Sequence, residues 1–173
     1  EKVLERIRRR VVAGNESKRK LFDRAMATAR RKAAAAEERD RFTPLDRLKW
    51  ALSDALVYRG VRHVFGKRFQ YAVSGGAPLQ LETAEFFAGA GVRILEGYGL
   101  TVHCGAATVN QLDNCRLGTV GKPLPGVDIR IASDGEILLR SQCVMLEYWN
   151  DADASAAALA GAWLHTGDVG EFD

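Results

Sequence analysis

The N-terminal stretch carries apolar residues at the spacing typical of helices that bury one face. This stripe comprises Leu4, Ile7, Val11, Leu21, Phe22 and Met26. Gly14-Asn15 interrupts the stripe, and Ser17 follows as a residue that can cap a second helix, expected to run to about Arg39. Ala, Arg, Lys and Glu dominate that second segment and are strong helix formers. The pattern therefore predicts two helices separated by a break.

A further helix is expected to begin at Thr43, whose hydroxyl can cap it, with Pro44 at its first position. Apolar residues at helical spacing follow, and they predict one buried face. These residues are Leu45, Leu48, Leu52, Leu56 and Val57.

From Phe69 onward, short apolar runs alternate with glycine-rich segments. Residues 69–73 predict a buried strand that stops at the segment 74–78, and residues 79–89 predict a helix that Gly91 ends. Residues 92–95 predict a second strand, ending at a loop over residues 96–101. This order is the start of an α/β sheet, and its two loops lie at the carboxyl ends of strands, where open α/β sheets bind ligands.

The expected helix over residues 79–89 has Glu82 and Glu85 facing outward, with three apolar side chains available for packing. Those three are Leu81, Phe86 and Phe87.

The C-terminal segment predicts a small antiparallel unit beside the α/β part. Residues 118–126 are a turn-rich link, and residues 127–131 alternate apolar and polar side chains as a half-buried strand does. Ser133-Asp-Gly135 is a hairpin turn signal, followed by a returning strand over residues 136–139. Residues 151–160 predict a short Ala-rich helix.

The composition excludes several classes of protein. With 173 residues, 47% of them hydrophobic, the chain has the length of one domain or one domain with an appendage, and it is not wholly disordered. It has no apolar run of about 18 residues, so no membrane span is expected, and no secretory signal is visible. Three cysteines without a CxxC pair argue against a disulfide framework and fit a reducing compartment. The start without Met suggests a fragment of a longer protein.

The charge is unevenly distributed. Residues 1–72 contain 20 Lys and Arg against 9 Asp and Glu, a balance of +11, whereas residues 73–173 contain 5 against 13, a balance of −8. The basic half creates a positive field, but no nucleic-acid motif accompanies it. Two interpretations stay open: a solvated charged face of ordinary helices, and a surface for an anionic membrane or ligand.

The two glycine-rich loops carry side chains suited to a flat, phosphorylated ligand. Gly75 and Gly76 let the backbone come close to such a ligand without a Cβ clash, and Pro78 fixes the exit. Tyr98, between two glycines, is expected to expose the face of its ring for stacking, and the Thr101 hydroxyl can donate to a phosphate. The alternative is that both segments are merely tight turns.

Asp168 follows a glycine and is expected in a turn, where its carboxylate can accept two hydrogen bonds from a vicinal diol such as ribose. A turn-forming Asp with no ligand is the alternative.

Five segments carry a resemblance to a known family: residues 74–79, 96–101, 116–126, 135–138 and 165–168. In order and spacing they resemble the adenylate-forming superfamily, in particular the long-chain fatty acyl-CoA synthetases. The resemblance implies an α/β fold, as a fragment of the large N-terminal domain of such an enzyme.

Within that one incomplete AMP-binding domain, three regions are expected. Residues 1–68 are its basic helical part, residues 69–110 its α/β part with the adenine-binding loops, and residues 111–173 its small β unit with the ribose-binding segment.

The resemblance implies a two-step reaction in which a fatty acid and ATP give an acyl-adenylate and pyrophosphate, and CoA then displaces AMP. It implies ATP/AMP and Mg²⁺ as cofactors, CoA as co-substrate, no nucleic-acid partner, and a cytoplasmic location that leaves contact with a membrane surface open. Thr101 would be catalytic, at the α-phosphate. The implied nucleotide-binding residues are Gly75, Gly76, Ala77, Pro78, Glu96, Gly97, Tyr98, Gly99, Leu100, Thr101 and Asp168.

The implied roles are specific. Residues 76–78 would line the adenine slot through their backbone, and Tyr98 would stack on adenine. Gly99 would lie near the acyl group, and Asp168 would hold the ribose hydroxyls.

The sequence departs from the family pattern in three ways. The glycine- and Ser/Thr-rich phosphate loop is missing, and the chain stops before the hinge and the domain with the catalytic lysine. Val102 stands where the family has the Glu expected to bind Mg²⁺, so no metal ligand is expected there. His103 is a poor Mg²⁺ ligand, and Glu96 already fills its own family position.

We therefore expect this polypeptide alone not to activate fatty acids. Two alternatives stay open: an enzyme that activates another acid, and a non-catalytic nucleotide-binding relative.

The remaining candidates are weaker. His63, His103 and His165 lack metal-ligand spacing, and His165 is expected to pack or to form hydrogen bonds. Cys104 follows His103, but a buried or inert thiol is expected. The sequence contains no GxSxG, Walker A or GxGxxG motif.

Overall fold

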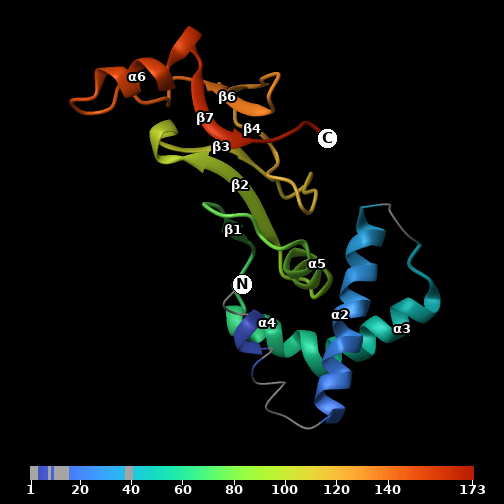
Figure 1. Ribbon diagram of the computed structural model, residues 1–173. Coiled ribbons are helices and arrows are strands. Elements are labelled where there is room, and N and C mark those ends of the chain that lie inside the picture. Colours follow the sequence, from blue (N-terminus) through green and yellow to red (C-terminus); the bar gives the residue numbers. More distant parts are fainter. Residues whose placement is uncertain (1–3, 8, 10–15, 38–40) are drawn as a thin grey trace. The chain divides into compact units, whose positions relative to one another are not determined.

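The computed structural model describes residues 4–7, 9, 16–37 and 41–173 (Figure 1). It divides into two compact parts: a helical part, Glu1–Leu95 with Arg116–Thr119, and a sheet part, Glu96–Cys115 with Val120–Asp173. In the described residues, no helix is both long and apolar enough to cross a membrane. The expected break at Gly14-Asn15, the expected core residue Val11 and the expected helix end at Arg39 lie outside the described residues.

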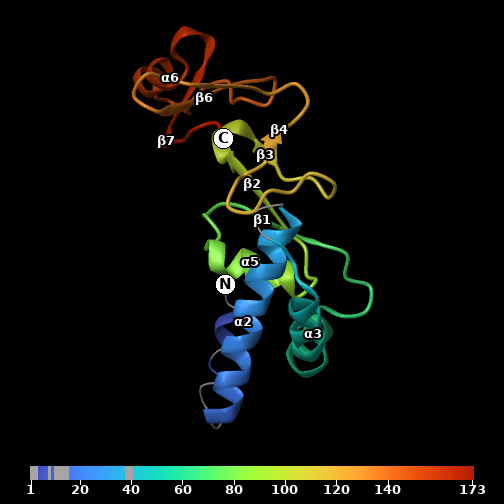
Figure 2. The same cartoon turned by 90° about the vertical axis from the view of Figure 1, so that its right-hand side faces the viewer.

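In the helical part, α2 (Glu16–Ala36) buries one face against α5 and α3 (Figures 1 and 2). Leu4, Phe22 and Met26 are buried, which confirms the predicted stripe at these positions. The prediction that Ser17 caps the helix is wrong. Because α2 already begins at Glu16, Ser17 lies inside its first turn.

Helix α3 (Pro44–Ser53) begins where the sequence predicts. The Thr43 side chain accepts a hydrogen bond from the Asp46 amide at 3.2 Å, and the Thr43 amide donates to Asp46 Oδ2 at 3.0 Å. This reciprocal capping box satisfies backbone donors that a helix start leaves unpaired. The π-helix η1 (Asp54–Tyr58) and α4 (Arg59–Phe65) continue the chain.

The prediction of a buried leucine face on this helix is wrong. Leu45, Leu48, Leu52 and Leu56 are between 57% and 68% exposed. The opposite face is buried instead. Trp50 donates its indole N–H to the Gly89 carbonyl at 2.8 Å, and Asp46 pairs with Arg31 at 3.0 Å. Only Val57, of the predicted set, packs against the core.

The segment β1 (Ala72–Ser74), α5 (Leu81–Gly89) and β2 (Ile94–Leu100) confirms the predicted order of strand, helix and strand. The first strand is shorter than predicted and not buried, because β1 lies at the edge of its sheet and Val73 is 64% exposed. In α5, Phe86 and Phe87 are buried as predicted, whereas Leu81 is 44% exposed.

The prediction that Glu82 and Glu85 of α5 face outward is not confirmed: both are half-buried, because they pair with α2. Arg30 contacts Glu82 at 3.1 Å and Glu85 at 3.4 Å. The two helices approach so closely that a Cβ on Gly89 would lie 2.3 Å from the Ala29 carbonyl oxygen. An aromatic cluster completes the core, and the Tyr58 hydroxyl donates to the Ala25 carbonyl at 2.6 Å. Its rings are Phe22, Tyr58, Phe65, Phe69, Phe86 and Phe87.

In the sheet part, β2 pairs antiparallel with β3 (Gly105–Val109), and β3 with β4 (Lys122–Pro123). A second antiparallel sheet has the order β5-β6-β7. Its strands are β5 (Asp128–Ile131), β6 (Glu136–Arg140) and β7 (Leu164–Val169). The turn at residues 133–135 joins β5 to β6, which confirms the predicted hairpin.

Short helices complete the sheet part. They are η2 (Thr101–His103), α6 (Ala152–Ala158) and η3 (Ala160–Ala162). Helix α6 begins at the cap residue Asp151, as predicted, and lies beside β7 in both views (Figures 1 and 2).

Two predicted loops are strands. Residues 96–100 belong to β2, because β3 returns alongside them and pairs with their backbone. Asp168 lies in β7 rather than in a turn, since β7 pairs with β6 up to Val169.

Candidate functional site

Two candidate residues of the sheet part, far apart in sequence, meet at the ends of β2 and β7. The Tyr98 hydroxyl donates a hydrogen bond to Asp168 Oδ2 at 2.7 Å. Tyr98 is half-buried and packs against the cluster of Ala107, Leu139 and Leu164, so its ring is less exposed than the sequence predicts. Asp168 is exposed. The pair therefore presents an accessible carboxylate beside an aromatic ring.

The phenol of Tyr98 stays neutral in this environment. Burial first, and then the adjacent Asp168 carboxylate, raise the pKa of Tyr98 to about 12, although a hydrogen bond with Thr166 acts in the opposite direction. A neutral hydroxyl can donate to Asp168 throughout the physiological pH range. Tyr98 therefore acts as a hydrogen-bond donor to Asp168 and holds its carboxylate in place.

A second carboxylate shapes the strand that carries Asp168. Glu136 Oε1 accepts a hydrogen bond from the Gly167 amide at 2.9 Å, and Oε2 lies 2.8 Å from His165 Nδ1. The Gly167 amide first, and then His165, lower the pKa of Glu136. The register in which β6 pairs with β7 shifts between Glu136 and Leu138, and Gly167 has a φ of +73°. The resulting bulge lets the Asp168 amide donate to the Thr166 hydroxyl at 3.1 Å.

These contacts confirm that His165 is a hydrogen-bonding residue. The sequence analysis assigned no role to Glu136. Its position directly after the hairpin glycine was the one feature that could have drawn attention to this carboxylate.

The glycines of β2 lie against the next strand. A Cβ on Gly99 would lie 2.1 Å from the Gly105 carbonyl oxygen, and one on Gly97 would lie 2.8 Å from that of Thr108. Glu96 is 8% exposed, and its carbonyl accepts from the Asn110 amide at 2.8 Å. Leu100 packs against the same apolar cluster as Tyr98. The close approach of β3 is thus sufficient to require glycine at both positions.

Thr101 and Val102 begin the short helix η2 at the end of β2. Thr101 is exposed, so its hydroxyl is available to a ligand. Val102 is half-buried against the apolar cluster, and its carbonyl accepts from the Met145 amide at 2.7 Å. Within the described ranges, His, Cys, Asp and Glu form no group of three or more that could hold a metal ion. The side chains here do not fit Mg²⁺, which requires oxygen ligands.

His103 and Cys104 point to different environments. His103 is 1% exposed, and its Nε2 lies 2.9 Å from Ser141 Oγ. Cys104 has a left-handed backbone (φ 54°) and is exposed, so of the expected buried or inert thiol the buried form is not found. With His103 engaged by Ser141, the structure supplies no base to Cys104 from that neighbour.

The first glycine-rich segment lies in the helical part. Residues 75–78 are exposed and follow β1 directly. Gly76 has a φ of +81°, and a Cβ placed on it would meet no atom within 4 Å. This segment is an open turn, which leaves its backbone accessible.

Comparison with known proteins matches residues 18–149 to the family described as AMP-binding enzyme. The long-chain-fatty-acid–CoA ligase FadD15 of Mycobacterium bovis is 42% identical over 163 residues, which cover 93% of this chain. The same alignment covers 27% of FadD15, so the chain spans about a quarter of the length of the curated relatives it matches.

Solved structures show the same architecture. O-succinylbenzoate Coenzyme A Synthetase (MenE) from Bacillus subtilis, in complex with ATP and magnesium ion, is 30% identical with a TM-score of 0.55, over 60% of this chain and 24% of that chain. The N-terminal domain of FACL13 from Mycobacterium tuberculosis is 29% identical with a TM-score of 0.53, over 60% of this chain and 29% of that chain. These matches confirm the predicted fold class.

Proposed function

The chain belongs to the family of AMP-binding enzymes, and on that premise we propose that it contributes the adenosine-binding part of a long-chain fatty acid–CoA ligase. Membership confirms the resemblance carried by the five motifs. In the proposed reaction, the fatty-acid carboxylate attacks the α-phosphorus of ATP, which gives an acyl-adenylate and releases pyrophosphate. The thiol of CoA then attacks the acyl carbon and AMP leaves.

The hydrogen bond between Tyr98 and Asp168 carries this proposal. It supports a site in which the Tyr98 ring stacks on adenine while Asp168 accepts hydrogen bonds from the ribose hydroxyls. In the same proposal Thr101, exposed at the end of β2, contacts the α-phosphate.

The open turn after β1 would supply the adenine slot. Residues 76–78 are exposed, and the left-handed Gly76 leaves backbone groups accessible to a flat ring. We assign Gly75 to the same turn. Glu96, Gly97 and Leu100 would build the wall beneath the nucleotide, since they are packed within or beside β2. Gly99 would leave room for the acyl group.

We further propose that this polypeptide alone does not turn over fatty acids. Val102 offers no oxygen ligand, so a metal that stabilises charge in the transition state would lack a carboxylate here. Losing such a ligand should weaken the chemical step far more than nucleotide binding.

The three regions 1–68, 69–110 and 111–173 would then act as one nucleotide-binding domain. The free cysteines fit a reducing, cytoplasmic location.

Calorimetry with AMP and 2′-deoxy-AMP tests the adenosine site. The Asp168→Asn variant should bind AMP about tenfold more weakly, because a charge-assisted hydrogen bond is lost. The loss should be much smaller for 2′-deoxy-AMP, which lacks one of the hydroxyls that Asp168 would accept from. Asp113→Asn, an equal change of charge at an exposed position of the same part, should behave as the parent.

Two results would contradict the assignment. Equal loss for both nucleotides would show that Asp168 does not act through the ribose diol. Failure of AMP to bind the parent chain would remove the adenosine site itself.

A turnover assay tests competence. Incubation with ATP, Mg²⁺ and palmitate should release no pyrophosphate from this polypeptide, and clear turnover would refute the proposal. In an intact protein that contains this chain, Val102→Glu should raise turnover substantially. If that protein is already fast and the change does nothing, the assignment of position 102 is wrong.

A non-catalytic nucleotide-binding relative is the second candidate, and Val102 packed among apolar side chains favours it. It predicts equal affinity for ATP with and without Mg²⁺, and no turnover even in the intact protein. An enzyme for another carboxylic acid would instead turn over when palmitate is replaced by a shorter or aromatic acid.

A further inference from the structure

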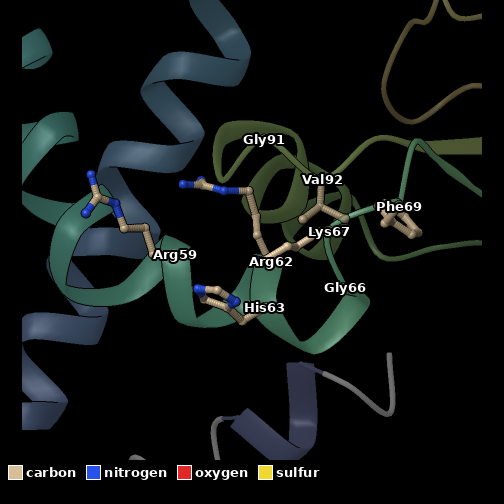
Figure 3. Close-up of a pocket in the computed structure, with 8 residues that line it drawn as sticks. All are labelled: Arg59, Arg62, His63, Gly66, Lys67, Phe69, Gly91 and Val92. Atoms are coloured by element: carbon tan, nitrogen blue, oxygen red, sulfur yellow. The ribbon is translucent and has the colours of Figure 1, made fainter.

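A cavity in the helical part is not used by the proposed site. Its volume is about 350 Å³, within the usual range of small-molecule pockets (Figure 3). It is lined by Arg59, Arg62, His63, Gly66, Lys67, Phe69, Gly91 and Val92. Phe69 and Val92 precede β1 and β2 in the chain, so the cavity lies where these strands begin. The open turn at residues 75–78 follows the other end of β1, and the two sites are therefore distinct.

The cavity wall carries more positive than negative charge. Asp54 pairs with Arg62 at 2.7 Å and with Arg59 at 3.5 Å, so one carboxylate faces two guanidinium groups. Lys67 is exposed, and no described residue pairs with its ammonium group. In Figure 3, Arg59 and Arg62 extend from α4, and Lys67 belongs to the turn that follows it. An anion entering the cavity would meet this uncompensated charge.

Part of the wall is held in place before any ligand arrives. Arg62 Nη1 donates to the Ala90 carbonyl at 2.7 Å, while Nη2 contacts Asp54, so its guanidinium is anchored at both ends. Gly66 and Gly91 have φ values of +88° and +82°, which favour glycine and leave the backbone uncovered. Phe69 adds an apolar surface beside the cations, and Val92 behind it belongs to the buried core. The chemistry suits a phosphate group attached to an apolar body.

Helix electrostatics explains only part of this arrangement. Arg62 and His63 lie in the last turn of α4, where cations offset the partial negative charge of the helix end. Lys67 lies beyond that end, after Gly66, and forms no bond to the last carbonyls: the Gly66 amide, not Lys67, donates to the His63 carbonyl at 3.2 Å. The charge of Lys67 is therefore available to a ligand at the cavity.

We propose that this cavity binds a phosphate group, with Lys67 and Arg59 at its mouth and Arg62 at its base. The phosphate can belong to a free phosphorylated metabolite or to the headgroup of an acidic phospholipid. This inference does not rest on the proposed ligase activity, because it uses none of the residues assigned to the adenosine site.

Titration of the chain with inorganic phosphate, followed by amide chemical shifts, tests the site. Saturable shifts should be centred on Gly66, Lys67 and Gly91. Lys67→Gln should weaken the affinity by roughly tenfold, since one charge-assisted contact is removed. Lys49→Gln, an equal change of charge at an exposed residue of α3, should leave the affinity unchanged. Both lysines are exposed, so both variants should keep the parent melting temperature.

Co-sedimentation with phosphatidylcholine vesicles, with and without phosphatidic acid, identifies the source of the phosphate. Binding only to the acidic vesicles, weakened by Lys67→Gln and not by Lys49→Gln, assigns the cavity to a lipid headgroup. Saturable phosphate binding without vesicle binding assigns it to a free phosphorylated compound. Absence of both, or equal effects of the two lysine substitutions, overturns the proposal.

Discussion

Two glycine-rich segments that look alike in sequence have opposite structures. Residues 75–78 form an exposed turn after β1, where a Cβ on Gly76 would meet nothing within 4 Å. Residues 96–100 continue the strand β2, where a Cβ on Gly99 would lie 2.1 Å from the backbone of β3. Position 76 requires glycine because its φ is +81°. Position 99 requires glycine because the backbone of β3 leaves no room for a side chain.

The difference separates two uses of glycine at a candidate site. An open, left-handed glycine leaves backbone groups free for a ligand, so a substitution there should disturb the turn and binding more than the core. A packed glycine lets a neighbouring strand approach, so a substitution there should disturb the fold first.

The largest effect is expected from Gly99→Ala. The new methyl group would overlap the Gly105 carbonyl, and because that atom is backbone, β3 itself would have to move. We expect the free energy of unfolding to fall by about 3 kcal/mol, the upper range for overpacking. Urea denaturation of the parent and the variant measures this difference.

Gly60→Ala is the matched control for that substitution. Gly60 lies within α4, and a Cβ there would meet nothing within 4 Å. Alanine favours a helix by about 1 kcal/mol over glycine, so this variant should be more stable than the parent. A Gly99→Ala variant as stable as the parent would show that β3 does not pack against β2 as described.

The sequence was sufficient to predict features whose cause is local. The capping box at Thr43 and Asp46 and the hairpin turn at residues 133–135 depend on neighbours a few residues away. The Thr43 cap and the hairpin turn were predicted at the correct positions, whereas the reciprocal bond to Asp46 was not predicted. The five family motifs likewise identified the fold class before any contact was known.

Features that depend on distant partners were mispredicted. A glycine-rich run such as residues 96–100 favours a turn by local chemistry, and only pairing with β3 makes it a strand. The leucine spacing on α3 shows that one face is apolar, but it does not show which face packs. The face that carries Trp50 and Asp46 is the one that contacts the rest of the helical part. The bond between Tyr98 and Asp168 was not mispredicted in this way: it joins residues 70 positions apart, and the family resemblance, not a local pattern, assigned both residues to one nucleotide site.

A smaller effect is expected from Gly76→Ala. No clash is created, so the cost comes only from holding an L-residue at a φ of +81°, about 1 kcal/mol. Differential scanning calorimetry should give a modestly lower melting temperature, well short of the effect of Gly99→Ala. If the two alanine variants were equally destabilised, the distinction between an open and a packed glycine would be wrong.

Tyr98→Phe tests the hydrogen bond that β2 and β7 share. Removing the hydroxyl should lower the free energy of unfolding by about 0.5 kcal/mol, because the bond is partly exposed to water.

The raised pKa of Tyr98 adds a dependence on pH. Its stabilising contribution is present below pH 10.0, the ordinary value, and is lost as pH rises through about 12.

Alkaline titration of phenolate absorbance checks this assignment. Tyr58, whose pKa burial also raises to about 12, serves as an internal reference that the variant retains. The substitution should remove one of two late-titrating groups. Loss of an early-titrating tyrosine instead would show that Tyr98 is not shielded in the way described.

The smallest effect is expected from Glu136→Gln. This substitution tests whether the Glu136 carboxylate stabilises the β-bulge that carries Asp168. Because the Gly167 amide and His165 lower the pKa of Glu136, its contribution is present above pH 4.5 and is lost as pH falls through the depressed value. Between neutral and acidic pH the parent should therefore lose more stability than Glu136→Gln does. Glu147→Gln, at an exposed position, should keep the parent's acid sensitivity in urea denaturation at both pH values. Identical acid sensitivity of the parent and Glu136→Gln would mean that the Gly167 bulge forms without its carboxylate, and that the position of Asp168 is set by pairing with β6 alone.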